Sequence, residues 1–445
     1  MLYDPDIAAA APMRRAAPRR KPVSLLVFGL NYTPELIGIG PYTTGLAEEM
    51  AQRGHCVRVV AGQPYYPRWR VERQLDGAWE TSERRGVEVT HCPLYVPNRP
   101  NAVRRLRHYA SFAAGAFVPM MRAIKRERPD AVFAVAPSLA AFPVAWIAAR
   151  LRGASLWLHI QDFEVDMAFA TGLLHYRKPL GRMARAFERF MIGRADVVSS
   201  ISPKMCERLV KMGLPQDRVV ELRNWANHAA AIERADGSRL RREWRLEGKT
   251  VALYSGNIGA KQGLELVVEA ARALQDRTDI VILVCGEGPN RSALKQKAHG
   301  LANIIFKPLQ SPAGFAEMMA MADIHLLPQV ADAADLVLPS KLPNILASGR
   351  PVVATAAAGT GLASETLGCG LVVPPGRAGA IADAVRRLAD DPELSEALGA
   401  EGKRRAGLRW SLGHVAERFE KRLLREARRR DQASVSASSA AIPAQ

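Results

Sequence analysis

The chain alternates short, continuously apolar runs with longer stretches of helical periodicity, and this alternation recurs in two series. Strands without polar alternation are typical of parallel sheets that helices cover on both faces. The pattern therefore predicts an α/β fold of two doubly wound, Rossmann-like domains. The first series of apolar runs covers residues 23–30, 56–62, 87–94, 131–136, 155–160, 196–201 and 219–224. The second covers residues 250–256, 279–286, 303–308, 323–328, 351–355 and 370–374.

The length of the chain agrees with two domains, because 445 residues exceed one ordinary hydrophobic core. Residues 225–249 are polar and weakly patterned, and we expect the linker there. We expect an N-terminal domain at 23–225 and a C-terminal domain at 226–409. A terminal helix at 410–430 is expected to pack back towards the N-terminal domain. The basic leader at 1–22 and the tail at 431–445 are expected to be disordered.

Charge and cysteine content narrow the class of protein. The formal net charge of +18 favours an anionic partner, which could be a nucleic acid, a membrane surface or a phosphorylated substrate. The leader does not have the order of a secretory signal peptide, so we expect a cytoplasmic protein. The five cysteines include no C-x-x-C pair, and they predict neither a zinc site nor a disulfide framework.

A run of 19 residues without a charge, 131–149, raises the question of a membrane span. Pro137, Ser138 and Pro143 interrupt the run. The stretch is therefore interpreted as a buried strand that ends in a turn before a helix.

The first strand is followed by a glycine loop and a helix start. Gly38 and Gly40 flank a single isoleucine, and Pro41 suits the first turn of a helix. Exposed N–H groups at such a helix start attract anions. The spacing of Gly38, Gly40 and Gly45 is not the dinucleotide fingerprint, and a tight turn without a ligand is the alternative.

Two loops of the second half repeat this arrangement and add lysines. Gly256 and Asn257 end a strand, and Lys261 lies near the next helix start. Ser340 and Lys341 begin another short helix, which Ser340 is expected to cap. A lysine at a helix start opposes the helix dipole unless an anion is present. Together, the loops predict a nucleotide diphosphate ligand in the cleft between the domains.

Several long stretches also carry a family resemblance over about residues 23–425. They include "NYTPELIGIGPYTTGLAEEMAQRGHCVRVV", "QPYYPRW", "LHIQDFEVD", "SGNIGAKQGLE", "CGEGP" and "VLPSKLPNILASG". The chain resembles the retaining nucleotide-sugar glycosyltransferases of family 4, in the branch of colanic acid or exopolysaccharide biosynthesis. The resemblance implies the GT-B architecture, in which two Rossmann-like domains face each other across a cleft.

The resemblance also implies roles for individual residues. Lys261, Lys341 and Asp162 are the expected catalytic residues. Asn257 stands where the family usually has arginine, and Asn344 aligns with the family glutamate that holds the ribose. His159 is expected to be structural. The remaining donor-binding residues implied are Gly38, Gly40, Gly256, Gly286, Glu287, Phe306, Leu309 and Ser340.

The mechanism implied by the resemblance is a front-side substitution, in which the leaving diphosphate oxygen deprotonates the acceptor hydroxyl. No pair of carboxylates can be assigned to a double displacement. The lysines and helix starts would stabilise the charge that develops on the leaving diphosphate. We expect no cofactor and no metal ion, since the nucleotide sugar is a co-substrate.

The acceptor expected from the resemblance is a glycan on a polyprenyl diphosphate. Residues 104–130 have cationic ends around a 13-residue apolar stretch, which suits a helix lying on an anionic membrane surface, at the inner face of the cytoplasmic membrane. A core helix with solvated ends is the alternative.

Two other functions remain open at this point. A nucleotide-sugar epimerase shares the architecture, but it would need an acid and a base around the sugar. A noncatalytic basic protein that binds nucleic acid or a membrane would need a continuous cationic stripe with interleaved aromatic residues. The lysines lie instead at separate helix starts, so we expect no nucleic acid partner.

Overall fold

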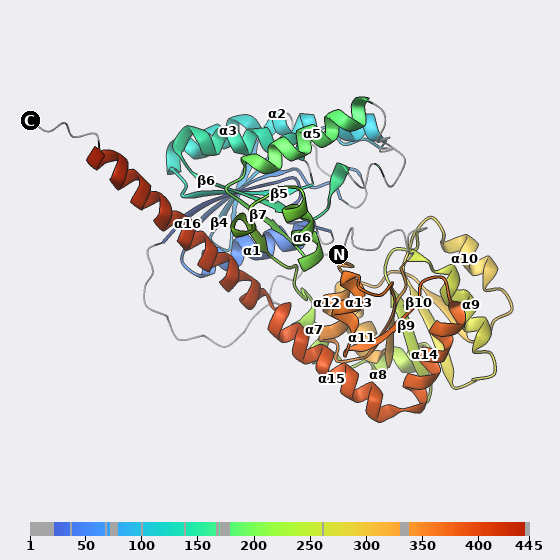
Figure 1. Cartoon of the computed structure of the whole chain (residues 1–445). Helices are drawn as coiled ribbons and strands as arrows, with labels where there is room; N and C mark the ends of the chain where they lie inside the picture. The colour runs from blue at the N-terminus through green and yellow to red at the C-terminus, as the bar shows by residue number, and fades with distance from the viewer. Residues whose placement is uncertain are drawn as a thin grey trace, which may run out of the picture.

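The computed structural model describes residues 22–35, 38–66, 69–71, 79–98, 101–137, 139–165, 169, 179–259, 262–329 and 338–440. Two sheets lie one above the other, each with helices on its faces (Figure 1). The fold is the predicted pair of Rossmann-like domains.

The first sheet has the strand order β3-β4-β2-β1-β5-β6-β7-β8. All neighbours are parallel except β3 and β4, which are antiparallel. The strands are β1 (Ser24–Gly29), β2 (Cys56–Gly62), β3 (Glu80–Arg84), β4 (Val87–Cys92), β5 (Ala131–Ala136), β6 (Ser155–Ile160), β7 (Val197–Ser200) and β8 (Val219–Glu221). The helices around it are α1 (Gly40–Gln52), α2 (Ala102–Glu127), α3 (Phe142–Arg152), α5 (Pro179–Arg194) and α6 (Pro203–Lys211).

The second sheet is parallel throughout, in the order β11-β10-β9-β12-β13-β14. Its strands are β9 (Thr250–Ser255), β10 (Ile280–Cys285), β11 (Ile304–Lys307), β12 (Ile324–Leu327), β13 (Val352–Thr355) and β14 (Gly370–Val373). The helices of this half are α7 (Ala229–Arg234), α8 (Ser238–Glu243), α9 (Glu265–Ala273), α10 (Arg291–Lys297), α11 (Pro312–Met321), α12 (Leu342–Ala347), α13 (Gly361–Thr366), α14 (Ala378–Asp390) and α15 (Pro392–Arg409).

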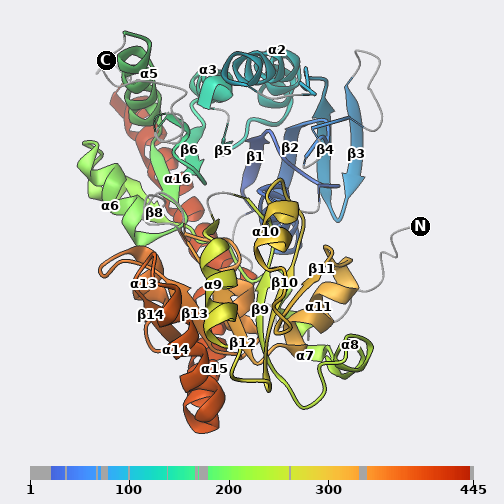
Figure 2. The same cartoon turned by 90° about the vertical axis from the view of Figure 1, so that its right-hand side faces the viewer.

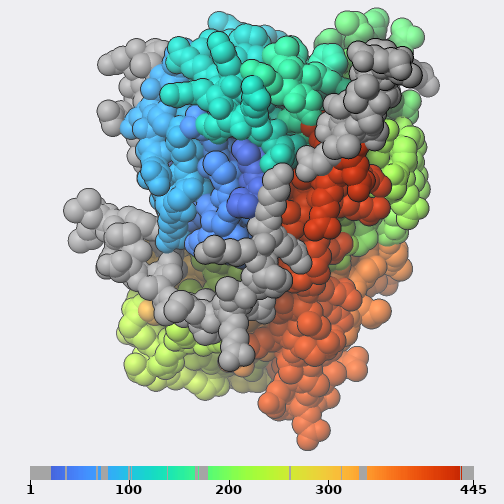
Figure 3. Space-filling model, turned by 90° about the vertical axis from the view of Figure 1, so that its left-hand side faces the viewer, coloured from blue at the N-terminus to red at the C-terminus, as the bar shows by residue number. Residues whose placement is uncertain are grey.

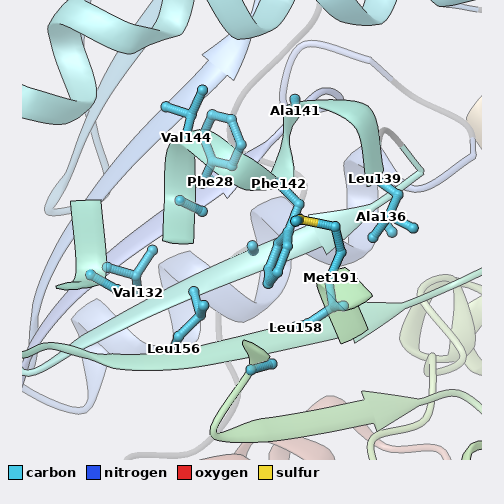
Figure 4. Packing of buried hydrophobic residues seen from close by; sticks show 14 of the residues in the cluster. Phe28, Val132, Ala136, Leu139, Ala141, Phe142, Val144, Leu156, Leu158 and Met191 are labelled. Carbon is cyan, nitrogen blue, oxygen red and sulfur yellow. The ribbon is translucent and has the colours of Figure 1, made fainter. Parts of the chain in front are cut away.

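The central strands of each sheet are buried on both faces, which explains why they lack polar alternation. Residues of β5 and β6 are all buried, and so are those of β10. Figure 4 shows one side of the first sheet, where Phe28, Val132 and Leu158 lie among Phe142 of α3 and Met191 of α5.

The stretch 131–149 forms β5 and most of α3, as interpreted from its prolines. Among the described residues, no helix is long and apolar enough to cross a bilayer.

The segment predicted to be a linker differs from that expectation. Residues 225–249 contain α7 and α8, and Ile232, Leu240 and Trp244 are buried in the core of the second domain. Both helices have six residues, too few to form a stable helix without tertiary packing. Their sequence therefore carries little periodic signal of its own.

The last helix, α16 (Leu412–Ala440), runs from the second domain along the side of the first (Figure 3). Phe419 packs on the rings of Phe133 and Trp157, with ring centroids 5.0 and 4.6 Å apart. Arg53 of the first domain also donates to Glu420, at 2.9 Å. The helix continues through 431–440, where a disordered tail was predicted, because no proline or glycine interrupts those residues.

Candidate active site

A cavity of about 180 Å³ lies between the two domains. Gly38, Pro41 and Tyr42 line it from the first domain. The residues that line it from the second half of the chain are Asn227, His228, Ser255, Gly256, Cys285, Leu309, Gln310, Phe315, Met318, Met319, Ser340, Lys341, Asn344 and Ile345. Of the predicted site residues, the structure thus gathers Gly38, Gly256, Leu309, Ser340, Lys341 and Asn344 around one space.

The glycine loop of the first domain is built around a buried carboxylate, Glu35. Its Oε1 accepts from the backbone N–H groups of Tyr65 and Tyr66 at 3.0 Å each, and its Oε2 accepts from Asn31 Nδ2 at 2.8 Å. A side chain at Gly40, the first residue of α1, would press on Glu35. Glu35 therefore fixes this helix start against the loop that contains Tyr65 and Tyr66.

Burial raises the pKa of Glu35, and the three hydrogen bonds oppose that rise. The sequence analysis did not assign Glu35 a role. Its signal was the short spacing from Asn31 in "NYTPE", which lies inside a stretch already quoted for the family resemblance.

Tyr66 connects this loop to Asp162, which follows β6. Gly38 has a φ of +78°, and a Cβ there would touch the Tyr66 ring. Burial raises the pKa of Tyr66, with further contributions from the negative charges of Glu35 and then Asp162. Asp162 is half-buried and is not among the residues that line the cavity.

His159, in β6 and three residues before Asp162, is buried. Its Nδ1 is 2.9 Å from Ser199 Oγ, and its Nε2 is 3.0 Å from Gln161 Nε2. Burial lowers its pKa to about 3. This environment agrees with a structural role.

The loop of the second domain is built around a cation, Lys341. Its Nζ donates to Tyr254 Oη at 2.8 Å and lies 4.1 Å from the centre of the Tyr254 ring. The Tyr254 hydroxyl in turn donates to the Asn257 carbonyl at 2.6 Å. Burial lowers the pKa of Lys341 to about 8. None of the carboxylates within the described ranges pairs with this ammonium group.

Gly256 is required opposite this lysine. It has a φ of +136°, and a Cβ there would collide with Cε and Nζ of Lys341. Glycine therefore lets the end of β9 and the ammonium group share one side of the cavity.

Ser340 precedes α12 but does not cap it. Lys341 is the N-cap residue, and its side chain makes no capping hydrogen bond. All six residues of α12 are buried, because the helix packs inside the domain rather than at its surface.

Gly286 and Glu287 support the Gly256 loop instead of lining the cavity. Gly256 N donates to the Cys285 carbonyl at 2.9 Å, and Ile258 N donates to the Glu287 carbonyl at 2.8 Å. The Glu287 side chain is exposed and lies 3.6 Å from Arg291. Of "CGEGP", only Cys285 lines the cavity.

Phe306 packs against the core of the second domain, whereas Leu309 lines the cavity. The Asn257 side chain is exposed and is not in the lining. Lys261 lies outside the described residues.

Asn344 joins the cavity wall to the segment that follows the first domain. Its Oδ1 accepts from His228 N at 3.1 Å, and its Nδ2 donates to Asn227 Oδ1 at 2.9 Å. The His228 ring lies 4.9 Å from that of Phe315 in α11. Sequence reasoning missed these partners because they lie in the stretch interpreted as a linker.

One face of α11 supplies further wall residues, Phe315, Met318 and Met319. Their spacing of three and four places them together on the helix, a signal that the sequence did contain. A group of three histidine, cysteine or acidic side chains that could hold a metal ion is not found in the described part of the chain.

Comparison with known families matches both domains. Residues 38–225 match the model described as "Glycosyl transferase 4-like domain", and residues 237–405 match "Glycosyl transferases group 1". The chain is 42% identical over 348 residues to "Putative colanic acid biosynthesis glycosyl transferase WcaI" of Escherichia coli K12. That alignment covers 76% of this chain and 85% of the relative.

Solved structures share the fold at low identity. Sucrose-phosphate synthase from Thermosynechococcus elongatus superposes with a TM-score of 0.68 at 15% identity, over 89% of this chain and 98% of that one. Anabaena Alr3699/HepE, solved in complex with UDP-glucose, gives a TM-score of 0.61 at 14% identity, over 90% and 99%. The domain matches favour a transferase over an epimerase or a basic binding module. The chain belongs to the glycosyltransferases of this two-domain, GT-B type, as its sequence resemblance implied.

Proposed function

We propose that this glycosyltransferase moves a sugar, with retention of configuration, from a nucleotide-diphosphate sugar to a growing exopolysaccharide similar to colanic acid. The observation that carries the donor assignment is the interdomain cavity with the ammonium group of Lys341 on its wall. A half-buried cation without a described carboxylate partner is costly, and a bound diphosphate would compensate its charge.

The diphosphate would lie between the two glycine loops. The glycine loop before α1 borders the cavity from one domain through Gly38, and Lys341 offers a formal charge from the other. Lys341 would stabilise negative charge that develops on the leaving diphosphate. The acceptor hydroxyl would then lose its proton to that leaving group. Lys261 and the absence of a metal requirement remain predictions.

The acceptor would approach from the first domain, past Tyr66 and Asp162. Tyr66 lies against Gly38 at the cavity, and Asp162 acts electrostatically on Tyr66. The name of the Escherichia coli relative supports a colanic-acid-like glycan. A polyprenyl-diphosphate carrier would bring the enzyme to a membrane surface.

The test is a screen of the purified chain against UDP, GDP and dTDP sugars, with lipid-linked glycans as acceptors, read as transfer of a labelled sugar. Lys341→Ala and Asp162→Asn are the decisive variants. Lys295→Ala, an exposed lysine on α10, is the matched control and should retain transfer. Full turnover by both decisive variants would show that the site is assigned wrongly.

Retention is tested separately by NMR of the product. The proposal requires the new glycosidic bond to keep the anomeric configuration of the donor. An inverted product would exclude the front-side mechanism while leaving the donor site in place.

A further inference from the structure

Helix α5 has a second apolar face that the fold does not bury. Leu180, Met183, Phe187 and Phe190 are 64%, 67%, 39% and 48% exposed. Their spacing of three, four and three residues places them in one row along the helix. We call these four residues the α5 stripe.

A different face of α5 already supplies its packing. Gly181, Glu188, Met191 and Ile192 are buried, and Met191 and Ile192 belong to the core beneath the first sheet. The α5 stripe is therefore not needed to hold the helix in place. An exposed apolar row on a helix indicates an interaction surface.

Neighbouring helices extend this surface. On α3, which contacts α5, Ile147 and Leu151 are exposed. Helix α2, which contacts α3, exposes Val103 and Leu106 in its first turn. Figures 1 and 2 both place α2, α3 and α5 together at the end of the molecule away from the second domain, so this surface does not close the interdomain cavity.

The apolar centre of α2 is different. Phe112, Ala116 and Met120 are fully buried in the first core. The stretch considered for membrane contact thus buries one face in the core, as the core-helix alternative expected, and keeps Phe117 and Val118 exposed on another face. Helix α5 exposes a further apolar row.

The charges on this surface are almost all positive. Helices α3 and α5 carry six arginines and one carboxylate, Glu188, and that carboxylate is buried. Arg182 and Arg189 are exposed beside the stripe. The Arg194 guanidinium lies over the Phe190 ring at 4.4 Å, so cation and apolar surface are adjacent. This combination fits the boundary between acyl chains and anionic headgroups.

We propose that the α5 stripe docks the enzyme on an anionic lipid bilayer, with the stripe in the headgroup region and the arginines on lipid phosphates. The proposal rests on the proposed function for its purpose, since a lipid-linked acceptor has to be reached at such a surface. Its physical basis is the complementarity between a cationic, apolar helix face and a negatively charged bilayer.

The test is flotation of the full chain with vesicles of phosphatidylglycerol and phosphatidylcholine, and with phosphatidylcholine alone. The wild-type chain should float with the anionic vesicles only. Met183→Ser/Phe187→Ser should lower the bound fraction at least about tenfold. Arg182→Glu/Arg189→Glu should also lower the bound fraction. The difference between this variant and the wild type should become smaller at high salt, because salt screens the attraction between the arginines and the lipid phosphates.

The matched control is Leu367→Ser/Leu408→Ser, which changes two exposed leucines of the second domain. This control should bind vesicles like the wild type. Thermal unfolding of every variant should match the wild type, because the altered side chains are exposed.

Three outcomes would overturn the proposal. The wild type could fail to bind anionic vesicles, or the stripe variant could bind as well as the wild type. In the third, the wild type would dimerise without vesicles and the stripe variant would not, with flotation unchanged, which would assign the stripe to a second copy. Flotation measures vesicle binding and does not depend on sugar transfer. If the chain transfers no sugar, the proposed function is refuted, but the flotation result still decides whether the stripe binds membranes.

Discussion

The two glycine loops that meet at the cavity are alike in sequence but opposite in charge. The loop at Gly38 and Gly40 is organised around the buried carboxylate of Glu35, whereas the loop at Gly256 faces the ammonium group of Lys341. A diphosphate is repelled by the first charge and attracted by the second. If the proposed function is right, the second domain would hold the diphosphate, while the first loop would form the opposite wall of the cavity.

The largest effect should come from removing the cation. Lys341→Ala should lower kcat/KM for the donor about 100- to 1000-fold, because it removes the charge proposed to stabilise the leaving diphosphate. Steady-state kinetics measure this change, with Lys295→Ala as the control. If the activity stays within twofold of wild type, the inference that Lys341 in the second loop binds the diphosphate is wrong.

Removing the carboxylate should affect stability more than turnover. Glu35→Ala should lower the free energy of unfolding by about 3 kcal/mol, because it leaves the buried N–H groups of Tyr65 and Tyr66 without an acceptor. Urea unfolding measures the loss. Glu35→Gln keeps an acceptor oxygen and should lose less, and Glu396→Ala, at an exposed position, should change little. An equal loss for Gln and Ala would mean that the charge, rather than the hydrogen bonds, holds the loop.

The pH dependence of donor affinity should show whether Lys341, rather than the first loop, binds the diphosphate. The ammonium group of Lys341 has its pKa lowered by burial from 10.5 to about 8. Above pH 8 the folded protein therefore loses this charge, and the affinity for a nucleotide diphosphate should fall by up to about tenfold per pH unit. Titration calorimetry across pH 7 to 10 measures this loss of affinity. The affinity of Lys341→Met should not fall over the same pH range.

The same pKa shift sets the sign for the stability of the ligand-free protein. Between about pH 8 and 10.5 the unfolded chain holds the Lys341 proton and the folded chain does not. The Lys341 contribution to the free energy of unfolding should then rise with pH in that window. A fall in this contribution, taken as the difference between wild type and Lys341→Met, would contradict the burial of the lysine.

The smallest effect should follow from removing the hydrogen bonds of Asn344, which join the cavity wall to the segment after the first domain. Asn344→Ala removes the bonds to His228 N and Asn227 Oδ1 and should cost about 1 to 2 kcal/mol of stability. Thermal unfolding compares it with Asn290→Ala, whose side chain makes no capping bond. If the two variants unfold alike, the link does not stabilise the closed cavity wall.

Sequence patterns predicted the buried strands closely, because a strand enclosed by helices must be apolar along its whole length. The strands β2, β5 and β6 match the expected residues at both ends. The exposed strand β3 (Glu80–Arg84) was missed, since the polar residues "ETSER" have no apolar alternation to read. Short helices such as α7 were missed because packing of Ile232, rather than local propensity, stabilises them.

The candidate site was predicted unevenly. Lys341 and Gly256 were found because a lysine near a helix start and a glycine after a strand are local signals. Phe306 was expected among the donor-binding residues but packs against the core of the second domain, because the side chain of an apolar residue at a strand end can face either the core or a cavity. Asn227 gave no local signal, and Tyr66 was part of the quoted stretch "QPYYPRW" but was not assigned a role.

The sequence by itself determined the two parallel sheets, the positions of the glycine loops, the positive charge and the family resemblance. Each of these follows from residues close together in the chain. Only the tertiary structure decided that Lys341 lies against Gly256, that Glu35 receives the N–H groups of Tyr65 and Tyr66, and that α5 keeps an apolar face exposed. These contacts depend on the order of strands in each sheet and on the docking of the two domains, which no local pattern encodes.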